Sequence, residues 1–292
     1  MSDLSGFLER CTFPPAGSSV VCGLSGGADS TALVALAITA GCSVSAVHVH
    51  HGLRPSADDD ADTASISAET LGVPFEVRYV DVADGPNLEA RARAARQRAL
   101  GAAALTGHTA DDQAETLLLA LLRGSGAAGL GAMSPGPTRP ILALRRTDTV
   151  EVCERLGLAV ATDPTNDDPR FRRNRIRHEL LPLLDDIAER DVTVLLARTA
   201  TLLRDDEALL DELALAVDPT DAAAVRCAPR PVAARAIRRW LQRDGYPPDA
   251  AAVGRVLGVA AGDAAACEIG GGVRVERRRG RLELYPSGPA SG

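Results

Sequence analysis

The 292-residue chain contains no lysine, and all of its 32 basic residues are arginines. This absence excludes every chemistry that needs a protein amine, including Schiff-base catalysis, pyridoxal phosphate enzymes and the lysine-dependent Walker A loop. Aromatic residues make up only 3% of the chain, so no stacking platform for single-stranded RNA is evident. The net charge of -7 also argues against indiscriminate binding of nucleic acid.

Cysteine pairs and long apolar runs are missing as well. The six cysteines are far apart and none forms a Cys-x-x-Cys pair, which argues against a zinc ribbon and favours a reducing cytosol. No secretory signal is recognised at the N-terminus. The uncharged residues 30–47 have the length of a membrane span, but Gly41, Ser43 and Ser45 divide them into an Ala-rich helix and a short strand. We therefore expect a cytoplasmic protein without a membrane span, and a homodimer is possible on this sequence.

The remaining composition is ordinary for a globular protein, and the length is sufficient for two domains. Between residues 18 and 144, short β-rich runs alternate with helical patterns, and a further strand-like run follows the Pro/Gly-rich residues 131–140. This alternation predicts a doubly wound α/β fold, a parallel sheet with helices on both faces. Ligands of such sheets bind at the carboxyl ends of the strands. The four β-rich runs are residues 19–24, 43–50, 75–80 and 102–106.

The chain changes character after Asp218. A long helix is predicted over 191–215, and beyond it the pattern indicates helices near 234–241 and 250–259 and a hairpin over 267–285. We predict a small, mostly helical C-terminal domain that contacts the substrate of the first domain. The predicted parts are a catalytic domain over 1–188, a linker helix over 189–217 and the C-terminal domain over 218–292.

The strongest motif is a Gly-Gly turn between a predicted strand and a predicted helix. Gly26 and Gly27 allow backbone N–H groups to approach a phosphate, and the helix N-terminus adds partial positive charge. Since lysine is absent, Mg²⁺ must neutralise the remaining phosphate charge, with Asp29 as its protein ligand. The alternative is a glycine turn whose polar residues only cap the helix. The predicted nucleotide site consists of Ser25, Gly26, Gly27, Ala28, Asp29 and Ser30.

A second motif spans residues 106–116, after the fourth β-rich run and at the start of a helix. Asp112 and Glu115 are three residues apart, and Asp111 and Glu115 are four apart, so a helix brings these carboxylates together. Carboxylates at this spacing repel each other unless a metal ion or a substrate ammonium lies between them. Their crowding could also raise the pKa of one carboxylate toward the range of a general base. The alternative is that the acidic residues only stabilise a helix N-terminus.

A third motif places five arginines within residues 170–177. Guanidinium groups match phosphate oxygens, so this segment is predicted to contact an RNA backbone or a departing pyrophosphate. The alternative is a solvated face neutralised by Asp163, Asp167 and Asp168.

Three histidines end the second β-rich run. In a strand His48 and His50 share one face and His51 points away, so we favour contacts with a nucleotide or with the fold over a metal site.

The turn at residues 25–30 resembles the PP-loop of ATP pyrophosphatases, which cleave ATP between the α and β phosphates and adenylate a carbonyl oxygen. Three further segments occur in order along the chain and narrow this resemblance; they are residues 49–54, 107–131 and 163–177. Together the motifs resemble those of tRNA(Ile)-lysidine synthases over about residues 18–185. The C-terminal part carries no motif of this kind.

The resemblance implies that ATP adenylates the C2 oxygen of the wobble cytidine in an isoleucine tRNA with a CAU anticodon, and that free L-lysine then displaces AMP. It implies that residues 25–30 bind ATP with Mg²⁺ on Asp29. Asp112 and Glu115 would hold the lysine, and one of them would take a proton from its ammonium group. Three arginines would contact tRNA or stabilise the leaving pyrophosphate, namely Arg173, Arg175 and Arg177. Arg173 would also act in catalysis.

Three other functions fit parts of this pattern. They are a PP-loop thiolase of tRNA, an amidating ligase of a small acid, and a non-catalytic module that binds a nucleotide.

Overall fold

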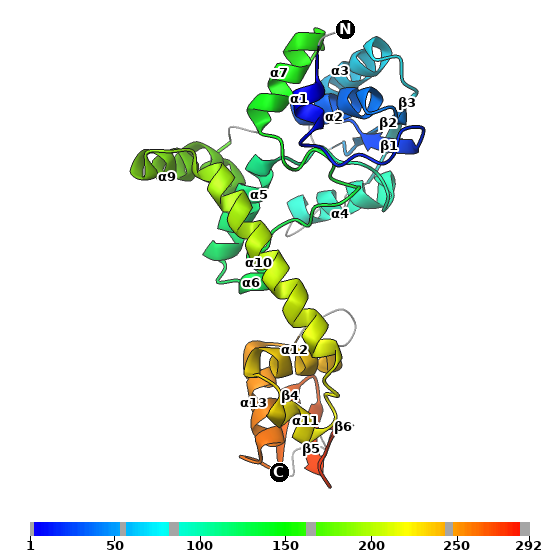
Figure 1. Ribbon diagram of the computed structural model, residues 1–292. Coiled ribbons are helices and arrows are strands. Elements are labelled where there is room, and N and C mark those ends of the chain that lie inside the picture. The colour runs from blue at the N-terminus through cyan, green and yellow to red at the C-terminus, as the bar shows by residue number, and fades with distance from the viewer. Residues whose placement is uncertain (1–2, 53–56, 82–87, 162–167, 243–247, 287–292) are drawn as a thin grey trace. The chain divides into compact units, whose positions relative to one another are not determined.

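The computed structural model describes residues 3–52, 57–81, 88–161, 168–242 and 248–286 (Figure 1). The chain forms two compact units, Met1–Leu202 and Leu203–Gly292, and the division falls within helix α10. The predicted domain boundaries at 188 and 218 stay a prediction. The elements of the first unit are α1 (Ser5–Leu8), β1 (Ser19–Gly23), α2 (Ala28–Thr39), β2 (Ser43–His50), α3 (Ala57–Thr70), β3 (Phe75–Tyr79), α4 (Leu88–Leu100), α5 (Ala110–Leu122), α6 (Ala127–Leu130), α7 (Arg146–Leu156), α8 (Arg172–Arg175), the π-helical turn η2 (Ile176–Leu180), α9 (Leu181–Ala188) and the start of α10 (Val192–Leu215).

A parallel sheet in the order β1-β2-β3 forms the centre of the first unit. The prediction of a fourth strand over 102–106 is wrong, because within this segment only Leu105 pairs with the sheet, through a single bridge to Cys22. A turn at Gly101 precedes it, and the N–H of Thr106 bonds to the carbonyl of Thr138 instead of to a strand. The strand-like run after residue 140 is also wrong, because its N–H groups bond within local turns.

Helices cover both faces of this sheet, which confirms the predicted doubly wound architecture (Figure 1). Cys22 and Ala46 face the core formed with α2, α3 and α7, whereas Val47 and Val49 face α4. Eight of the twelve residues of α2 are buried. Truncating a fully buried leucine such as Leu33 would cost about 2–5 kcal/mol, so the loop that precedes α2 has a rigid support.

Residues 30–47 form part of α2 and of β2, as the polar interruptions predicted. Within the described ranges, no helix combines the length and the apolar character that crossing a bilayer requires.

The second unit contains helices and an antiparallel sheet in the order β4-β5-β6. Its core is built on Ile237, Val256 and Val275, which are fully buried. The predicted helices are confirmed, whereas the predicted hairpin has a third strand. The elements of this unit, besides the end of α10, are α11 (Ala222–Cys227), α12 (Arg230–Leu241), α13 (Ala250–Ala261), β4 (Ala266–Gly270), β5 (Val273–Arg278) and β6 (Arg281–Pro286).

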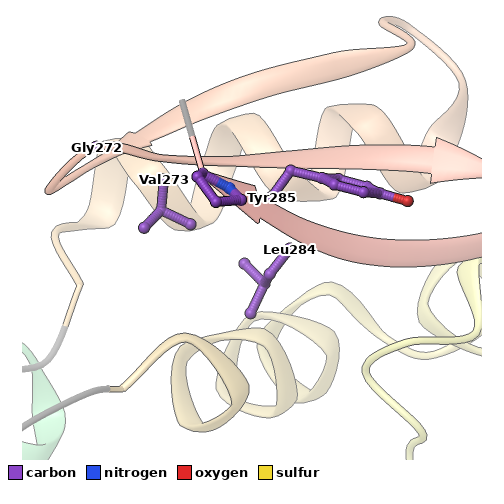
Figure 2. Close-up of a pocket in the computed structure, with 5 residues that line it drawn as sticks. Gly272, Val273, Leu284 and Tyr285 are labelled. Carbon is purple, nitrogen blue, oxygen red and sulfur yellow. The ribbon is translucent and has the colours of Figure 1, made fainter. Parts of the chain in front are cut away.

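A cavity of about 160 Å³ lies on this sheet beside Val273, Leu284 and Tyr285 (Figure 2). Its lining is mainly apolar, and its one titratable side chain, Tyr285, donates a hydrogen bond to Glu283 and lies under the Arg278 guanidinium. Since the Tyr285 hydroxyl is already engaged with Glu283, this cavity is not a candidate for acid–base chemistry.

Candidate active site

The Gly-Gly turn forms the nucleotide loop, by which we mean residues 25–30, between β1 and α2. Gly26 has a φ of +91°, and a Cβ there would lie 2.9 Å from the carbonyl oxygen of Asp60, so the position requires glycine. The Ser30 hydroxyl donates to the carbonyl of Gly27 at 2.9 Å and accepts from the N–H of Ser25 at 3.1 Å. The loop is therefore held in shape by its own backbone and hydroxyl groups.

Gly107 joins the second motif to this loop. A Cβ at Gly107 would lie 2.6 Å from the carbonyl oxygen of Asp29, so only glycine allows α5 to begin this close to the first turn of α2. As a result one guanidinium reaches both motifs: Arg146 lies 3.5 Å from an oxygen of Asp29 and 3.5 Å from an oxygen of Asp112. The sequence did not single out Arg146, since nothing in its local pattern sets it apart from the other arginines.

The carboxylates of the second motif have different partners. Asp112 accepts the N–H of Thr109 at 2.8 Å in a capping box, and its other oxygen accepts from Arg173 at 2.7 Å. Asp111 points elsewhere and pairs with Arg145 through two bonds of 3.0 and 3.1 Å. The helix-capping interpretation is thus confirmed for Asp112, whose second oxygen pairs with a guanidinium of the same chain, whereas the predicted contact with a metal ion or a substrate ammonium stays a prediction.

Glu115 is the most enclosed group of the site, with a side chain that is 0% exposed. It accepts from Arg173 at 2.5 Å and from Arg177 at 2.8 Å, and Arg146 lies 3.4 Å away. With Asp29 included, three carboxylates face three guanidinium groups and their formal charges cancel. We call the following residues the charge cluster: Asp112, Glu115, Arg146, Arg173 and Arg177.

The third motif divides its arginines between two faces of one helical segment. Arg173 and Arg177 are four residues apart and both turn toward α5, where Ile176 packs in the same apolar core as Ala114 and Leu118. Arg175 points away from them and pairs with Glu179 at the surface, at 2.7 Å. A π-helical turn follows directly, and such turns are frequent at functional sites. The spacing of four between Arg173 and Arg177 could have predicted that these two share one helix face and that Arg175 does not. The motif instead predicted one role for all three arginines.

Burial and charge shift the two aspartates in opposite directions. Burial raises the pKa of Asp29, against the charge of Arg146 and the hydrogen bond from Thr149. Burial also opposes the ionisation of Asp112, but the charges of Arg173 and Arg146 outweigh it and lower the pKa. Asp112 is therefore firmly anionic, whereas a cation beside Asp29 would relieve the cost of its charge.

Mg²⁺ fits this position. In the described part of the chain, no group of three or more His, Cys, Asp or Glu side chains could hold a metal by itself. Mg²⁺ usually takes one or two carboxylates and completes its shell with water and substrate phosphates. Asp29, whose side chain is 25% exposed at the end of the nucleotide loop, provides one such carboxylate.

Burial lowers the pKa of two histidines near the site and keeps them neutral. His48 bonds through Nδ1 to the carbonyl of Leu24 at 3.0 Å, which confirms a contact with the fold, and burial lowers its pKa. Burial lowers the pKa of His108 to about 4. The hydroxyl of Thr106 lies 3.0 Å from both Nδ1 of His108 and the carbonyl of Thr138, and its single proton must go to the carbonyl. Nδ1 of His108 therefore carries a proton and donates to the hydroxyl.

The Asp-Pro-Thr-Asn segment of the third motif, including Asp163 and Asp167, lies outside the described residues. Asp168 pairs with Arg170 at the surface.

Residues 4–184 match the family model described as a PP-loop domain, and residues 221–283 match the one described as the TilS substrate binding domain. The chain is 46% identical to the tRNA(Ile)-lysidine synthase of Nocardia farcinica over 248 residues, which cover 80% of this chain and 78% of that protein. It is 42% identical to that of Rhodococcus opacus over 293 residues, covering 91% and 89%.

Among solved structures, the U34-tRNA thiolase NcsA from Methanococcus maripaludis, solved with its 4Fe-4S cluster, is similar at a TM-score of 0.51 and 17% identity. The likeness covers 68% of this chain and 76% of that one, and at this identity it shows a shared fold alone.

The parallel sheet, the glycine turn at its carboxyl edge and the match over residues 4–184 define a PP-loop protein. The relatives narrow this class, because identities above 40% extend over most of both chains. The chain belongs to the tRNA(Ile)-lysidine synthase family.

Proposed function

We propose that the protein ligates L-lysine to C2 of the wobble cytidine in tRNA(Ile) with a CAU anticodon. The C2 oxygen of the cytidine attacks the α phosphate of ATP, and pyrophosphate leaves. The ε-amine of lysine then attacks C2 of the adenylated base, and AMP leaves with that oxygen. The products are lysidine in the tRNA, AMP and pyrophosphate.

One observation carries this proposal: a loop shaped for phosphate and a carboxylate site shaped for a cation meet at Gly107. Two half-reactions in one active site need this arrangement, because the activated base must be reached by ATP from one side and by an amine from the other. Family membership and the match over residues 221–283 support tRNA as the partner.

The nucleotide loop provides the ATP site in this proposal. Its N–H groups and the N-terminus of α2 receive the phosphates, and Asp29 holds Mg²⁺. Bound there, Mg²⁺ supplies positive charge that stabilises the leaving pyrophosphate. The Arg146 guanidinium lies 3.5 Å from an oxygen of Asp29, so it interacts electrostatically with this carboxylate.

The charge cluster provides the lysine site. Asp112 keeps a partly exposed carboxylate, at 11%, and we assign it the direct contact with an ammonium group of lysine. Its lowered pKa suits binding better than proton removal, so the proton transfer to Asp112 or Glu115 stays a prediction. Glu115 contacts no solvent, and a direct contact with lysine would require a guanidinium to move. We therefore assign it the positioning of Arg173 and Arg177.

The arginines divide accordingly between the reaction and the tRNA. Arg173 is close enough to Asp112 to contact the reacting groups and to stabilise the phosphate charge that develops as pyrophosphate leaves. Arg177 supports it through Glu115. Arg175 has a side chain that is 61% exposed, and we propose that it contacts the tRNA backbone.

We place the enzyme in the cytoplasm, where its free cysteines stay reduced and tRNA, ATP and lysine are available together. A homodimer stays a prediction, which light scattering on the purified protein tests.

Incubation of the purified protein with radiolabelled lysine, ATP, Mg²⁺ and a tRNA(Ile) transcript with a CAU anticodon tests the function. We expect label in the tRNA, and none when the wobble base is uridine. Pyrophosphate release without transfer of label would instead favour one of the other PP-loop reactions. No pyrophosphate release from folded protein would leave only a nucleotide-binding module.

A thiolase has little support in this chain. The described part contains no cluster of cysteines with other metal ligands, and burial raises the pKa of Cys22 and Cys153 to about 12 each. Both thiols therefore stay protonated and unreactive. Retention of activity by a Cys22→Ser, Cys153→Ser double variant would remove this alternative.

A further inference from the structure

A buried threonine beside the nucleotide loop has no role in the proposed function. Thr149 lies in α7, and its side chain is fully buried. Its hydroxyl lies 2.5 Å from Oδ1 of Asp29 and 2.8 Å from the carbonyl oxygen of Arg146. A hydroxyl has one proton, and an ionised carboxylate is a stronger acceptor than a carbonyl. The Thr149 hydroxyl therefore donates to Asp29.

One face of α7 holds the start of α2 at three points. Arg146, Thr149 and Cys153 follow each other at spacings of three and four residues, so they share one face of the helix. The Arg146 guanidinium lies 3.5 Å from Oδ2 of Asp29. The thiol of Cys153 lies 3.5 Å from the carbonyl oxygen of Ala28. Both oxygens of the Asp29 carboxylate therefore have a partner on α7, which fixes the orientation of this side chain.

Packing alone does not require a hydroxyl at position 149. The other buried residues of α7 are Val152 and Cys153, and α2 contributes mainly apolar side chains to the same core. Valine has nearly the shape of threonine and would avoid the cost of burying a hydroxyl. The hydroxyl of Thr149 adds only its hydrogen bond, and the acceptor of that bond is Asp29.

We propose that Thr149 is a positioning residue for Asp29 as the ligand of Mg²⁺. Its hydroxyl fixes the carboxylate through Oδ1 and leaves Oδ2, which has only the longer contact with Arg146, for the cation. Groups that orient a metal-ligating carboxylate in this way typically contribute about ten- to a hundred-fold to the affinity for the metal. The inference rests on the proposed function, because the assignment of Asp29 as the metal ligand belongs to it.

Two substitutions separate the hydroxyl from the shape of the side chain. Thr149→Val removes the hydroxyl and nearly keeps the volume, whereas Thr149→Ser keeps the hydroxyl. Thr31→Val in α2 is the matched control: Thr31 is equally buried, and its hydroxyl has no hydrogen-bond partner among the described residues. This control should behave as the wild type. If Thr149→Val does not fold, the comparison of Thr149→Ala with Thr149→Ser isolates the same hydroxyl.

Calorimetric titration with ATP, in the absence of tRNA, measures the effect on binding. With excess Mg²⁺, the Kd for ATP should be at least about ten-fold higher in Thr149→Val than in the wild type, and Thr149→Ser should stay close to the wild-type value. With EDTA in place of Mg²⁺, all the proteins should bind ATP equally. An unchanged Kd for Thr149→Val with Mg²⁺ would overturn the proposal. An equal loss with EDTA would also overturn it, because the hydroxyl would then support the loop and not the metal ligand.

The Mg²⁺ dependence of pyrophosphate release gives a second readout. The Mg²⁺ concentration for half-maximal release should rise about ten- to a hundred-fold in Thr149→Val, while the rate at saturating Mg²⁺ and the KM for lysine stay near the wild-type values. A lower rate at every Mg²⁺ concentration would indicate a merely structural role and contradict the proposal. If the wild type releases no pyrophosphate although Mg²⁺ strengthens its binding of ATP, the proposed function fails, and the calorimetric comparison still decides the role of Thr149.

Discussion

The nucleotide loop and the charge cluster lie against each other, yet different forces hold them in shape. The loop depends on local backbone geometry: a positive φ at Gly26 and hydroxyl bonds between Ser25, Gly27 and Ser30. The cluster depends on side-chain charges from three segments that are far apart in the sequence. Removing a group from the loop should therefore impair the chemistry, whereas removing a charge from the cluster should first impair stability.

The largest effect is expected for Asp29→Ala. Loss of the proposed Mg²⁺ ligand should lower tRNA-dependent pyrophosphate release by on the order of 10³-fold, comparable to the loss of a strong electrostatic contact to a transition state. Because the pKa of Asp29 is raised, its charge opposes folding at neutral pH, and thermal stability should not fall. Asp206→Ala, at an exposed position of α10, is the control. Near-normal release by the Asp29 variant would defeat the assignment of the loop.

Glu115→Gln should have the opposite profile. The substitution leaves the largely buried guanidinium of Arg177 without its counter-charge and leaves Arg173 with Asp112 alone, and we expect a loss of about 3–5 kcal/mol in the free energy of unfolding. Glu179→Gln removes the carboxylate of a solvent-exposed pair and should change the stability little, because solvent screens such pairs. Urea unfolding of both variants makes the measurement. Equal, small losses would mean that the cluster contributes nothing special to the fold.

Gly26→Ala tests the backbone side of the comparison. The positive φ and the 2.9 Å approach to the Asp60 carbonyl should cost about 1–3 kcal/mol of strain or displace the loop, with weaker ATP binding. Gly136→Ala, outside the nucleotide loop, is the control, since a Cβ there would meet no atom within 4 Å and its φ is not positive. Calorimetric titration with ATP should separate the two. Identical affinities would show that the shape of the loop does not depend on Gly26.

Acid should weaken the fold through His108. Its pKa is lowered to about 4 in the folded protein, so between pH 6.5 and 4 the unfolded chain binds a proton that the folded chain does not. The contribution is fully present above the unfolded pKa and is lost as the pH falls, by about 1.4 kcal/mol per unit within this window. His108→Gln should remove that part of the slope in urea unfolding between pH 7 and 4.5. Parallel curves for wild type and variant would contradict the shift.

The smallest effect concerns the two faces of the arginine segment. Arg175→Gln should lower the slope of log Kd for tRNA against log salt by about 0.7 to 0.9, the value of one phosphate contact. Arg177 is turned inward to Glu115, so Arg177→Gln should leave the slope unchanged while it lowers stability. An unchanged slope in the Arg175 variant would return this residue to an ordinary surface ion pair with Glu179.

The sequence predicted local features better than distant ones. The glycine turn, the helix start at Ala110 and the alternation of strands and helices are each determined within about ten residues, and the structure has them. The strand over 102–106 was wrong because a turn at Gly101 and a bond to Thr138, 32 residues beyond Thr106, limit it to one bridge. A β-rich run does not reveal such a competing partner.

The site shows the same limit. Asp29, Asp112 and Arg173 were selected from their motifs. In the structure, Arg146 lies near both Asp29 and Asp112, and Arg173 pairs with Asp112. Arg146 was missed because its role depends on contacts with residues 31 to 117 positions away.

The division of labour between loop and cluster can be measured in one half-reaction. Asp112→Asn removes the charge proposed to bind lysine but keeps an oxygen for the N–H of Thr109. Pyrophosphate release is followed with ATP and tRNA(Ile) in the absence of lysine. We expect a rate within a few-fold of the wild type, together with no transfer of lysine once it is added. A rate that falls as far as that of Asp29→Ala would show that the cluster is needed to activate the base, and the assignment of separate roles would be wrong.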